Sequence, residues 1–286
     1  MSGYTIFTDS CCDLDPGMVK KLSVTVIPMS FTIDGEAFSG VDYDLKDFYN
    51  KLRSGSKSST AQLNTEELKN IFRPILMKKK DIIYIALSSG MSGTVNCAYT
   101  AAEELMREAE GSKVLIIDSL TASLGQGLMV FYAANLKKQG KTIDEVYDYI
   151  MEHRLNFASW FTVDDLMFLH RGGRLSGGVA LFGTVLGIKP ILHVSNSGHL
   201  INIAKARGRK GSLNALVECM KISAIEPAHQ TVFISHGDCL TDAEYVAGQI
   251  EQLMGTKDIY ISSIGPVIGS HSGPGTVALF FFADGR

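Results

Sequence analysis

The sequence predicts an α/β fold with two domains, and three observations lead to this prediction. In the first half, uninterrupted apolar runs alternate with amphipathic helical patterns, which is typical of a parallel sheet covered by helices on both faces. In the second half, Ser195-Asn-Ser-Gly198 separates two β-rich runs as a hairpin turn would, which favours a mixed or antiparallel sheet with helices. The length of 286 residues, at roughly 150 per domain, predicts an N-terminal domain over 1–155 and a C-terminal domain over 156–286.

The elements of the first half follow from capping and periodicity. Pro16 opens a helix after Asp15, and Asn64 with Glu67 three residues later forms a capping box at the start of another. Asp34-Gly35 marks a hairpin turn. The expected strands cover 4–8, 24–33, 82–87 and 114–117, the expected helices begin at 16, 44, 64, 95 and 123, and a polar segment covers 54–60.

The second half shows shorter elements with glycine between them. A turn with Arg171-Gly-Gly-Arg174 precedes a glycine-rich apolar helix near 178–187. Residues 268–275 are expected to form a loop, because glycine and proline set their backbone. Strands are expected near 188–194, 199–205, 231–235, 258–264 and 277–283, and helices near 211–224 and 241–254.

Composition excludes several classes of protein. The 27 basic and 30 acidic residues give a net charge of −3, which argues against a nucleic-acid partner. With 45% hydrophobic and 20% charged residues the chain can bury a core, so disorder is excluded. Five cysteines without repeated spacing indicate a reduced, cytoplasmic compartment. No secretory signal is visible, and the longest uncharged apolar stretch, 177–188, is too short to span a bilayer.

The segment Leu87-Ser-Ser-Gly-Met-Ser-Gly-Thr94 carries the clearest sign of a binding site. It joins a buried strand to a helix, so the free N–H groups of the first helical turn point at whatever lies there. Gly93 permits an open backbone, and the hydroxyls of Ser92 and Thr94 add donors. This pattern predicts an anion cradle that contains no lysine; the alternative is ordinary capping by serine.

Other polar residues are candidates to converge on this cradle. Thr60 precedes a capped helix and is otherwise a turn residue, while His271 lies among glycines that would leave it free to donate to an anion. Two basic clusters, at 171–174 and 205–210, interrupt an acidic chain. They predict a docking patch for an acidic or phosphate-bearing partner, and the alternatives are a helix end and a solvated charged face. The patch consists of Arg171, Arg174, Lys205, Arg207 and Lys210.

Metal, ATP and hydrolase chemistry receive little support. Cys11-Cys12 are adjacent rather than spaced, so no metal site is expected, and the turn at 9–14 is interpreted as holding backbone. No Gly-x4-Gly-Lys-Ser/Thr pattern occurs. Ser92, Asp238 and His271 stand in the chain order of a hydrolase triad, but Thr94 occupies the position where a nucleophile elbow has glycine.

Taken together, these motifs resemble the DegV family of bacterial fatty acid-binding proteins, the FakB-type subunits of fatty acid kinase. The resemblance runs over nearly the whole chain. It rests on the order of Thr8-Asp-Ser-x-x-Asp13-Leu14, Ser88-Ser-Gly-Met-Ser92-Gly-Thr94, Asp118-Ser-x4-Ser123-x-Gly-x-Gly127, Phe161-x-Val-x-x-Leu166, Arg171-Gly-Gly-Arg174, Lys189-Pro190, the basic run 205–210 and His271-x-Gly-Pro-Gly275. The loop Thr60-Ala-Gln-Leu-Asn64 departs from the family's usual Thr-Ser-Gln-Pro-Ser but keeps the threonine.

The resemblance implies a two-domain fold with a long-chain fatty acid buried between the domains. It places Thr60, Ser92 and His271 at the carboxylate, with Gly93 and Thr94 in the same cradle, and Arg209 near the mouth. The C-terminal domain would contribute the acyl-chain tunnel, with the 177–187 helix as one wall, and the basic patch.

The resemblance also implies that the chain is not itself an enzyme. It would present the acid to a separate ATP-binding kinase subunit that forms the acyl phosphate, without a cofactor of its own, and transient contact with a membrane surface is left open. About fifteen buried carbon units at about 0.8 kcal/mol each would supply about 12 kcal/mol, and uncharged donors are expected to hold the carboxylate. The alternatives are a Ser92-dependent lipid esterase or thioesterase and a lipid-sensing regulator that needs no kinase.

Overall fold

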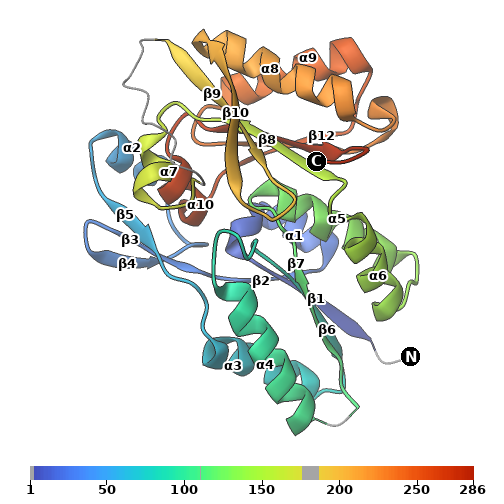
Figure 1. The fold of residues 1–286 in the computed structure, drawn as a ribbon. Helices are drawn as coiled ribbons and strands as arrows, with labels where there is room; N and C mark the ends of the chain where they lie inside the picture. The colour runs from blue at the N-terminus through green and yellow to red at the C-terminus, as the bar shows by residue number, and fades with distance from the viewer. Residues whose placement is uncertain (1–2, 110, 176–186) are drawn as a thin grey trace.

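The computed structural model describes residues 3–109, 111–175 and 187–286, and it has the predicted α/β fold (Figure 1). A parallel sheet of four strands has the order β2-β1-β6-β7. Its strands are β1 (Tyr4–Asp9), β2 (Thr25–Ile27), β6 (Asp81–Ala86) and β7 (Val114–Asp118). The carboxyl ends of β1, β6 and β7 lie at one edge, where the polar segments that follow these strands meet.

Helices cover both faces of this sheet because successive strand residues point to opposite sides. On β6, Ile82 and Tyr84 pack in the apolar cluster of α3 (Thr65–Leu76) and α4 (Thr94–Glu108). Ile83 and Ile85 pack on the other face, in the cluster of three further helices. These are α1 (Pro16–Leu22), α5 (Leu124–Lys138) and α6 (Ile143–His153).

The predicted caps are present, and one helix was missed. Asp15 caps α1, and Asn64 and Glu67 form the predicted capping box of α3. Helix α6 was not expected from the sequence, although Thr142 and Glu145 form a second capping box at its start. That Thr-x-x-Glu pattern is the signal that identifies α6.

Two expectations in residues 24–60 are wrong. The segment 24–33 is not one strand, because Pro28 and Met29 separate β2 from β3 (Ser30–Ile33), which belongs to a different sheet. The polar segment 54–60 is not entirely a loop, because its end forms β5 (Ser58–Thr60) beside β3. The predicted Asp34-Gly35 hairpin is confirmed: both residues have positive φ, and they join β3 to β4 (Glu36–Ser39). Helix α2 (Leu45–Arg53) lies beside this three-stranded sheet.

The second half forms a mixed six-stranded sheet with the order β10-β9-β8-β13-β11-β12. The β11–β12 pair is parallel, and the other pairs are antiparallel. The strands are β8 (Phe157–Thr162), β9 (Ile188–Val194), β10 (Leu200–Arg207), β11 (Val232–His236), β12 (Ile259–Ser263) and β13 (Val277–Phe282). The predicted hairpin joins β9 to β10, and helices α8 (Gly208–Ser223) and α9 (Leu240–Met254) cover one face (Figure 1).

Helix α5 occupies the space between the two large sheets. It contacts β1 and β6 on one side and β8, β11 and β13 on the other. Leu124, Leu128 and Met129 are fully buried in a core cluster that also contains residues of both sheets. A helix that is apolar around most of its circumference is suited to such a position.

Two short helices, α7 and α10, contact each other. Helix α7 (Met167–Arg171) ends at Gly172, as one interpretation of the Arg-Gly-Gly-Arg turn predicted. The loop expected at 268–275 is wrong in its first part, because residues up to Ser272 belong to α10 (Pro266–Ser272). Pro266 at the first turn and Gly273 after the last residue are helix start and stop signals. The expected helix at 178–187 lies outside the described residues, and no helix among the residues that are described is long and apolar enough to cross a membrane.

Arg286 joins several segments through one partly buried guanidinium. Its nitrogens donate to the carbonyl oxygens of Leu120, Ser195 and Phe157, and further bonds reach Ser119 and Arg154. The residues 119–120 follow β7, and Ser195 belongs to the β9–β10 turn. Burial, followed by the charge of Arg154, lowers the pKa of Arg286 to about 10.

We expect Arg286→Met to lower the free energy of unfolding by about 3 kcal/mol, because it leaves several partly buried carbonyls without their charged donor. Urea unfolding followed by circular dichroism measures this loss. Arg107→Met is the control, since Arg107 is exposed and contacts only Glu103 among the ion pairs of the described chain. An equal loss in both variants would contradict the structural role of Arg286.

Candidate functional site

A pocket lies where the four-stranded sheet, the six-stranded sheet and helix α10 meet. It encloses about 790 Å³ of space between atoms, the solvent at its open mouth included. Its lining residues are Met29, Thr60, Ala61, Gln62, Leu87, Met91, Ser92, Ala122, Ser123, Phe161, Leu169, Arg174, Val194, Leu200, Ile264, Val267, Ile268, His271, Ser272, Thr276, Ala278 and Phe280.

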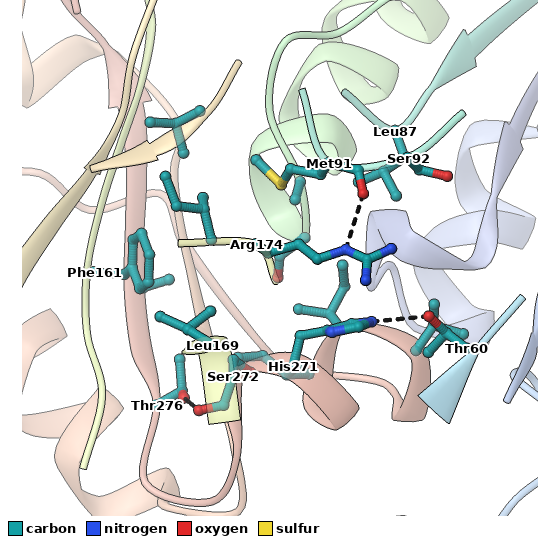
Figure 2. Close-up of a pocket in the computed structure, with 18 of the residues that line it drawn as sticks. Thr60, Leu87, Met91, Ser92, Phe161, Leu169, Arg174, His271, Ser272 and Thr276 are labelled. Carbon is teal, nitrogen blue, oxygen red and sulfur yellow. Dashed lines mark hydrogen bonds between the residues drawn. The ribbon is translucent and has the colours of Figure 1, made fainter. Parts of the chain in front are cut away.

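The walls of this pocket are mostly apolar. Phe161, Val194 and Leu200 come from or adjoin strands of the six-stranded sheet, and Leu169 comes from α7. Met91 faces them from the segment after β6. Figure 2 shows Phe161 and Leu169 on one side of the view, opposite the polar residues Thr60, Ser92 and His271. The pocket therefore has an apolar part and a polar part.

The polar part brings together four segments that are far apart in the sequence. Thr60 at the end of β5 and His271 of α10 form a hydrogen bond of 2.8 Å between Oγ1 and Nε2. Arg174 lies between them and the Ser92 segment, and its Nε donates to the carbonyl oxygen of Met91 at 3.1 Å (Figure 2). Nη1 of Arg174 also donates a hydrogen bond to the carbonyl oxygen of Gly172.

His271 is neutral at physiological pH in this environment. Burial is the main cause, and the positive charge of Arg174 is the second; together they lower the pKa of His271 to about 4. Nδ1 is buried and has no hydrogen-bond partner among the described residues. A neutral imidazole offers one donor and one acceptor, so its orientation rather than its charge matters for a ligand.

The Ser92 segment is the predicted strand-to-helix turn, between β6 and α4. The buried carboxylate of Asp9 accepts from the N–H of Leu87 at 3.1 Å and so holds the start of the segment. Ser92 lines the pocket, and its Oγ lies 3.0 Å from Oγ1 of Thr94. Gly93 and Thr94 do not line the pocket; they shape the turn, because a Cβ at Gly93 would lie 2.4 Å from Oε1 of Gln62.

The basic residues divide between the pocket and the surface. Arg174, expected on the docking patch, instead lines the pocket, so the polar part is not composed only of uncharged donors as expected. Arg209, expected near the mouth, is not a lining residue and pairs with Asp242 at 2.8 Å and Asp164 at 3.5 Å. The exposed members of the predicted patch are Arg171, Lys205, Arg207 and Lys210.

The hydrolase triad is not assembled. Asp238 forms an ion pair with Arg53, and Ser92 bonds to Thr94 rather than to His271. His271 has no acid at Nδ1 within the described chain, so nothing orients the ring as a general base. No group of three or more His, Cys, Asp or Glu side chains in the described residues is placed to hold a metal.

The turn at 9–14 holds backbone, as interpreted from the sequence. Oδ1 of Asp13 accepts from the N–H of Gly265 at 2.8 Å, and its other oxygen accepts from Ser123. Gly265 is the N-cap of α10, so this contact connects the edge of β1 to the helix that carries His271. Burial raises the pKa of Asp13 to about 7.

Several pocket residues were missed from the sequence, because their signals are those of ordinary core. Val194 and Leu200 flank the β9–β10 turn, and that hairpin pattern is the one available hint that they face the same space. Met29, between β2 and β3, and Phe280 of β13 carry no distinguishing pattern, since any apolar core residue has the same appearance.

Comparison with known proteins places the whole chain in one group. The family model described as "Uncharacterised protein, DegV family COG1307" matches residues 4–284. A DegV domain-containing protein of Clostridium perfringens is 44% identical over 287 residues, covering 99% of each chain.

Two solved structures are similar over their full length. One, a protein of Thermotoga maritima described as revealing fatty acid binding function, has a TM-score of 0.86 and 27% identity over 99% of this chain and 100% of its own. The other, a DegV family protein of Eubacterium eligens loaded with heptadecanoic acid, has a TM-score of 0.86 and 25% identity with the same coverage. By its family model and its curated relatives, the chain belongs to the DegV family.

Proposed function

We propose that the protein binds a long-chain fatty acid in the pocket between the two large sheets, with the carboxylate at Thr60, Ser92, Arg174 and His271. The observation that carries this proposal is the division of one pocket into an apolar part and a polar part. Family membership and the fatty acid held by a similar structure support it. The apolar walls account for the tail, since each buried CH₂ contributes about 0.8 kcal/mol.

The polar part suits a carboxylate better than a neutral head group. Arg174 supplies a positive charge, so an ionised acid avoids the cost of an unpaired buried charge. The Ser92 hydroxyl adds a donor, and the Thr60 hydroxyl offers one more when Nε2 of His271 donates to it.

The proposal extends to presentation of the head group to a separate ATP-dependent kinase subunit. An oxygen of the carboxylate would attack the γ-phosphorus of ATP held by that subunit, the bond to the β,γ-bridging oxygen would break, and ADP would leave. The product would be an acyl phosphate retained by this chain, which supplies neither the nucleotide site nor a catalytic group. Arg207 and Lys210 are exposed and near one another in the chain, which supports a docking role for their surface.

Native mass spectrometry of the purified protein, followed by lipid extraction, tests the binding proposal. We expect a stoichiometric mass increase that corresponds to a free fatty acid, and its loss after delipidation. A protein that carries no lipid and does not bind added hexadecanoic acid would overturn the proposal.

The kinase step has its own test. The loaded protein is mixed with ATP and the ATP-binding subunit of a bacterial fatty acid kinase, and hydroxylamine traps any acyl phosphate as the hydroxamate. We expect hydroxamate with the native chain and a large decrease with Arg207→Glu/Lys210→Glu. Fatty acid binding without hydroxamate would favour a lipid-sensing regulator instead.

A further inference from the structure

Helices α7 and α10 pack against each other through the glycine that follows each of them. A Cβ built on Gly172, after α7, would lie 2.2 Å from Nδ1 of His271 on α10. A Cβ built on Gly273, after α10, would lie 2.4 Å from the ring of Phe168 on α7. Each helix therefore places an aromatic ring directly over the backbone of the other, and neither contact leaves space for a side chain.

Gly172 is free of backbone strain, which separates it from most glycines at helix ends. Its φ of −72° and ψ of −11° are ordinary right-handed values that alanine adopts readily. The atoms closest to its missing Cβ are Nδ1, Cε1 and Cγ of His271. The imidazole ring is therefore the obstacle to a side chain at this position.

The ring cannot retreat without losing its contact with Thr60. It would have to move by roughly 1 Å for Nδ1 to reach ordinary van der Waals distance from an added Cβ. The other ring nitrogen is 2.8 Å from Oγ1 of Thr60, so a shift of this size either compresses that hydrogen bond below its ordinary range of about 2.7–3.2 Å or stretches it beyond that range. Because Nδ1 has no hydrogen-bond partner in the described chain, packing against Gly172 holds that side of the ring.

Gly172 also contacts the second polar group of the pocket. Its carbonyl oxygen accepts from Nη1 of Arg174, while Nε of the same guanidinium donates to Met91. The backbone of Gly172 thus restricts the position of the His271 ring by contact, and it restricts the position of the Arg174 guanidinium by a hydrogen bond. These two side chains come from different segments, and in the described part of the chain they bond to Thr60 and to Met91 and Gly172 rather than to each other.

We propose that Gly172 is a positioning residue that sets His271 and Arg174 at the spacing that a bound carboxylate requires. This inference rests on the fatty acid-binding function proposed above. It assigns the first glycine of Arg171-Gly-Gly-Arg174 a role in the pocket in addition to ending α7.

The test uses Gly172→Ala, with Gly248→Ala as the matched control. Gly248 lies in α9 with no atom within 4 Å of its missing Cβ, so alanine there has space. We expect the dissociation constant for hexadecanoic acid, measured by calorimetry on delipidated protein, to rise about tenfold in Gly172→Ala and to stay within twofold in Gly248→Ala. In a His271→Ala background the obstacle is absent, so Gly172→Ala should then change the dissociation constant by less than twofold.

A spectroscopic measurement separates positioning from general damage and needs no ligand. In the native protein the imidazole of His271 should stay neutral down to about pH 5, since burial and Arg174 lower its pKa. In Gly172→Ala the displaced ring should titrate at higher pH in ¹H–¹⁵N spectra, while the other histidines stay unchanged.

The two proposals fail in different ways. If the native protein binds no hexadecanoic acid, the proposed function is wrong, and the imidazole titration still reports whether Gly172 positions His271. If the native protein binds the acid but Gly172→Ala binds equally well with an unchanged His271 titration, the positioning role is overturned.

Discussion

Replacing Arg174 by methionine is expected to weaken the binding of hexadecanoic acid by about 10- to 100-fold. A hydrogen bond to a charged group contributes about 1.5–3 kcal/mol, and about 1.4 kcal/mol corresponds to a factor of ten in affinity. Methionine keeps an unbranched side chain of similar bulk but removes the guanidinium, which is the one cationic group among the described lining residues because His271 is neutral. Calorimetric titration of delipidated protein measures the change.

Arg171→Met is the control for this variant. Arg171 lies three residues earlier, is exposed, and stacks on the ring of Phe168 at 4.8 Å outside the pocket lining. We expect its affinity for the acid to stay within twofold of the native value. Arg174→Lys should fall between the two, because it keeps the charge but cannot reproduce both hydrogen bonds to Met91 and Gly172. Equal affinities in Arg171→Met and Arg174→Met would contradict the assigned head-group site.

The second large effect concerns the pH dependence of stability and Asp13. Burial raises the pKa of this carboxyl to about 7, from an ordinary value of 3.8. Between these two values the native state keeps a proton that the unfolded chain has released, so the free energy of unfolding falls as the pH rises. Below about pH 4 both states are protonated, and above about pH 7 both are ionised, so the loss is confined to this interval. It amounts to about 4 kcal/mol.

Asp13→Asn removes this titration while keeping the shape of the protonated side chain. The amide oxygen can accept from Gly265, and the amide nitrogen can donate to Oγ of Ser123 once that hydroxyl turns its proton from residue 13 to Oγ of Ser235, 2.9 Å away. We expect the variant to be about as stable as the native protein at pH 4.5 and more stable at pH 8, by up to about 4 kcal/mol. Urea unfolding at a series of pH values measures both curves.

Asp144→Asn serves as the control, because Asp144 is exposed and pairs with Lys113 on the surface. Its difference from the native protein should stay below about 1 kcal/mol at every pH. If the difference between Asp13→Asn and the native protein does not grow between pH 4.5 and pH 8, the carboxyl is ionised in the folded state throughout, and the assignment is wrong.

Local patterns were sufficient for most of the elements. The capping box at Asn64, the hairpin turn at Asp34-Gly35 and the apolar strand at 82–87 depend on interactions within a few residues, and the structure confirms all three. The expectations are wrong where one hydrophobic pattern is compatible with more than one structure. Residues 24–33 have the sequence pattern of one strand. Only their pairing shows two strands, because the first half pairs with β1 and the second half pairs with β4 and β5 in another sheet.

The pocket shows the same difference between what local sequence patterns indicate and what depends on contacts between distant segments. The sequence alone identifies Thr60 and Ser92 as polar residues beside a capped helix and a strand-to-helix turn, because their neighbours carry the turn and capping chemistry. It identifies His271 only as a polar residue among glycines, in a segment that is a helix where a loop was expected. The packing of distant segments, which the sequence does not reveal, places Arg174 at the pocket and pairs Arg209 with Asp164 and Asp242. Both arginines lie in basic clusters with similar local sequence. Which of the two arginines lines the pocket depends on how α7, α8 and α10 pack. Such packing brings together residues about a hundred positions apart, and no local sequence pattern relates them.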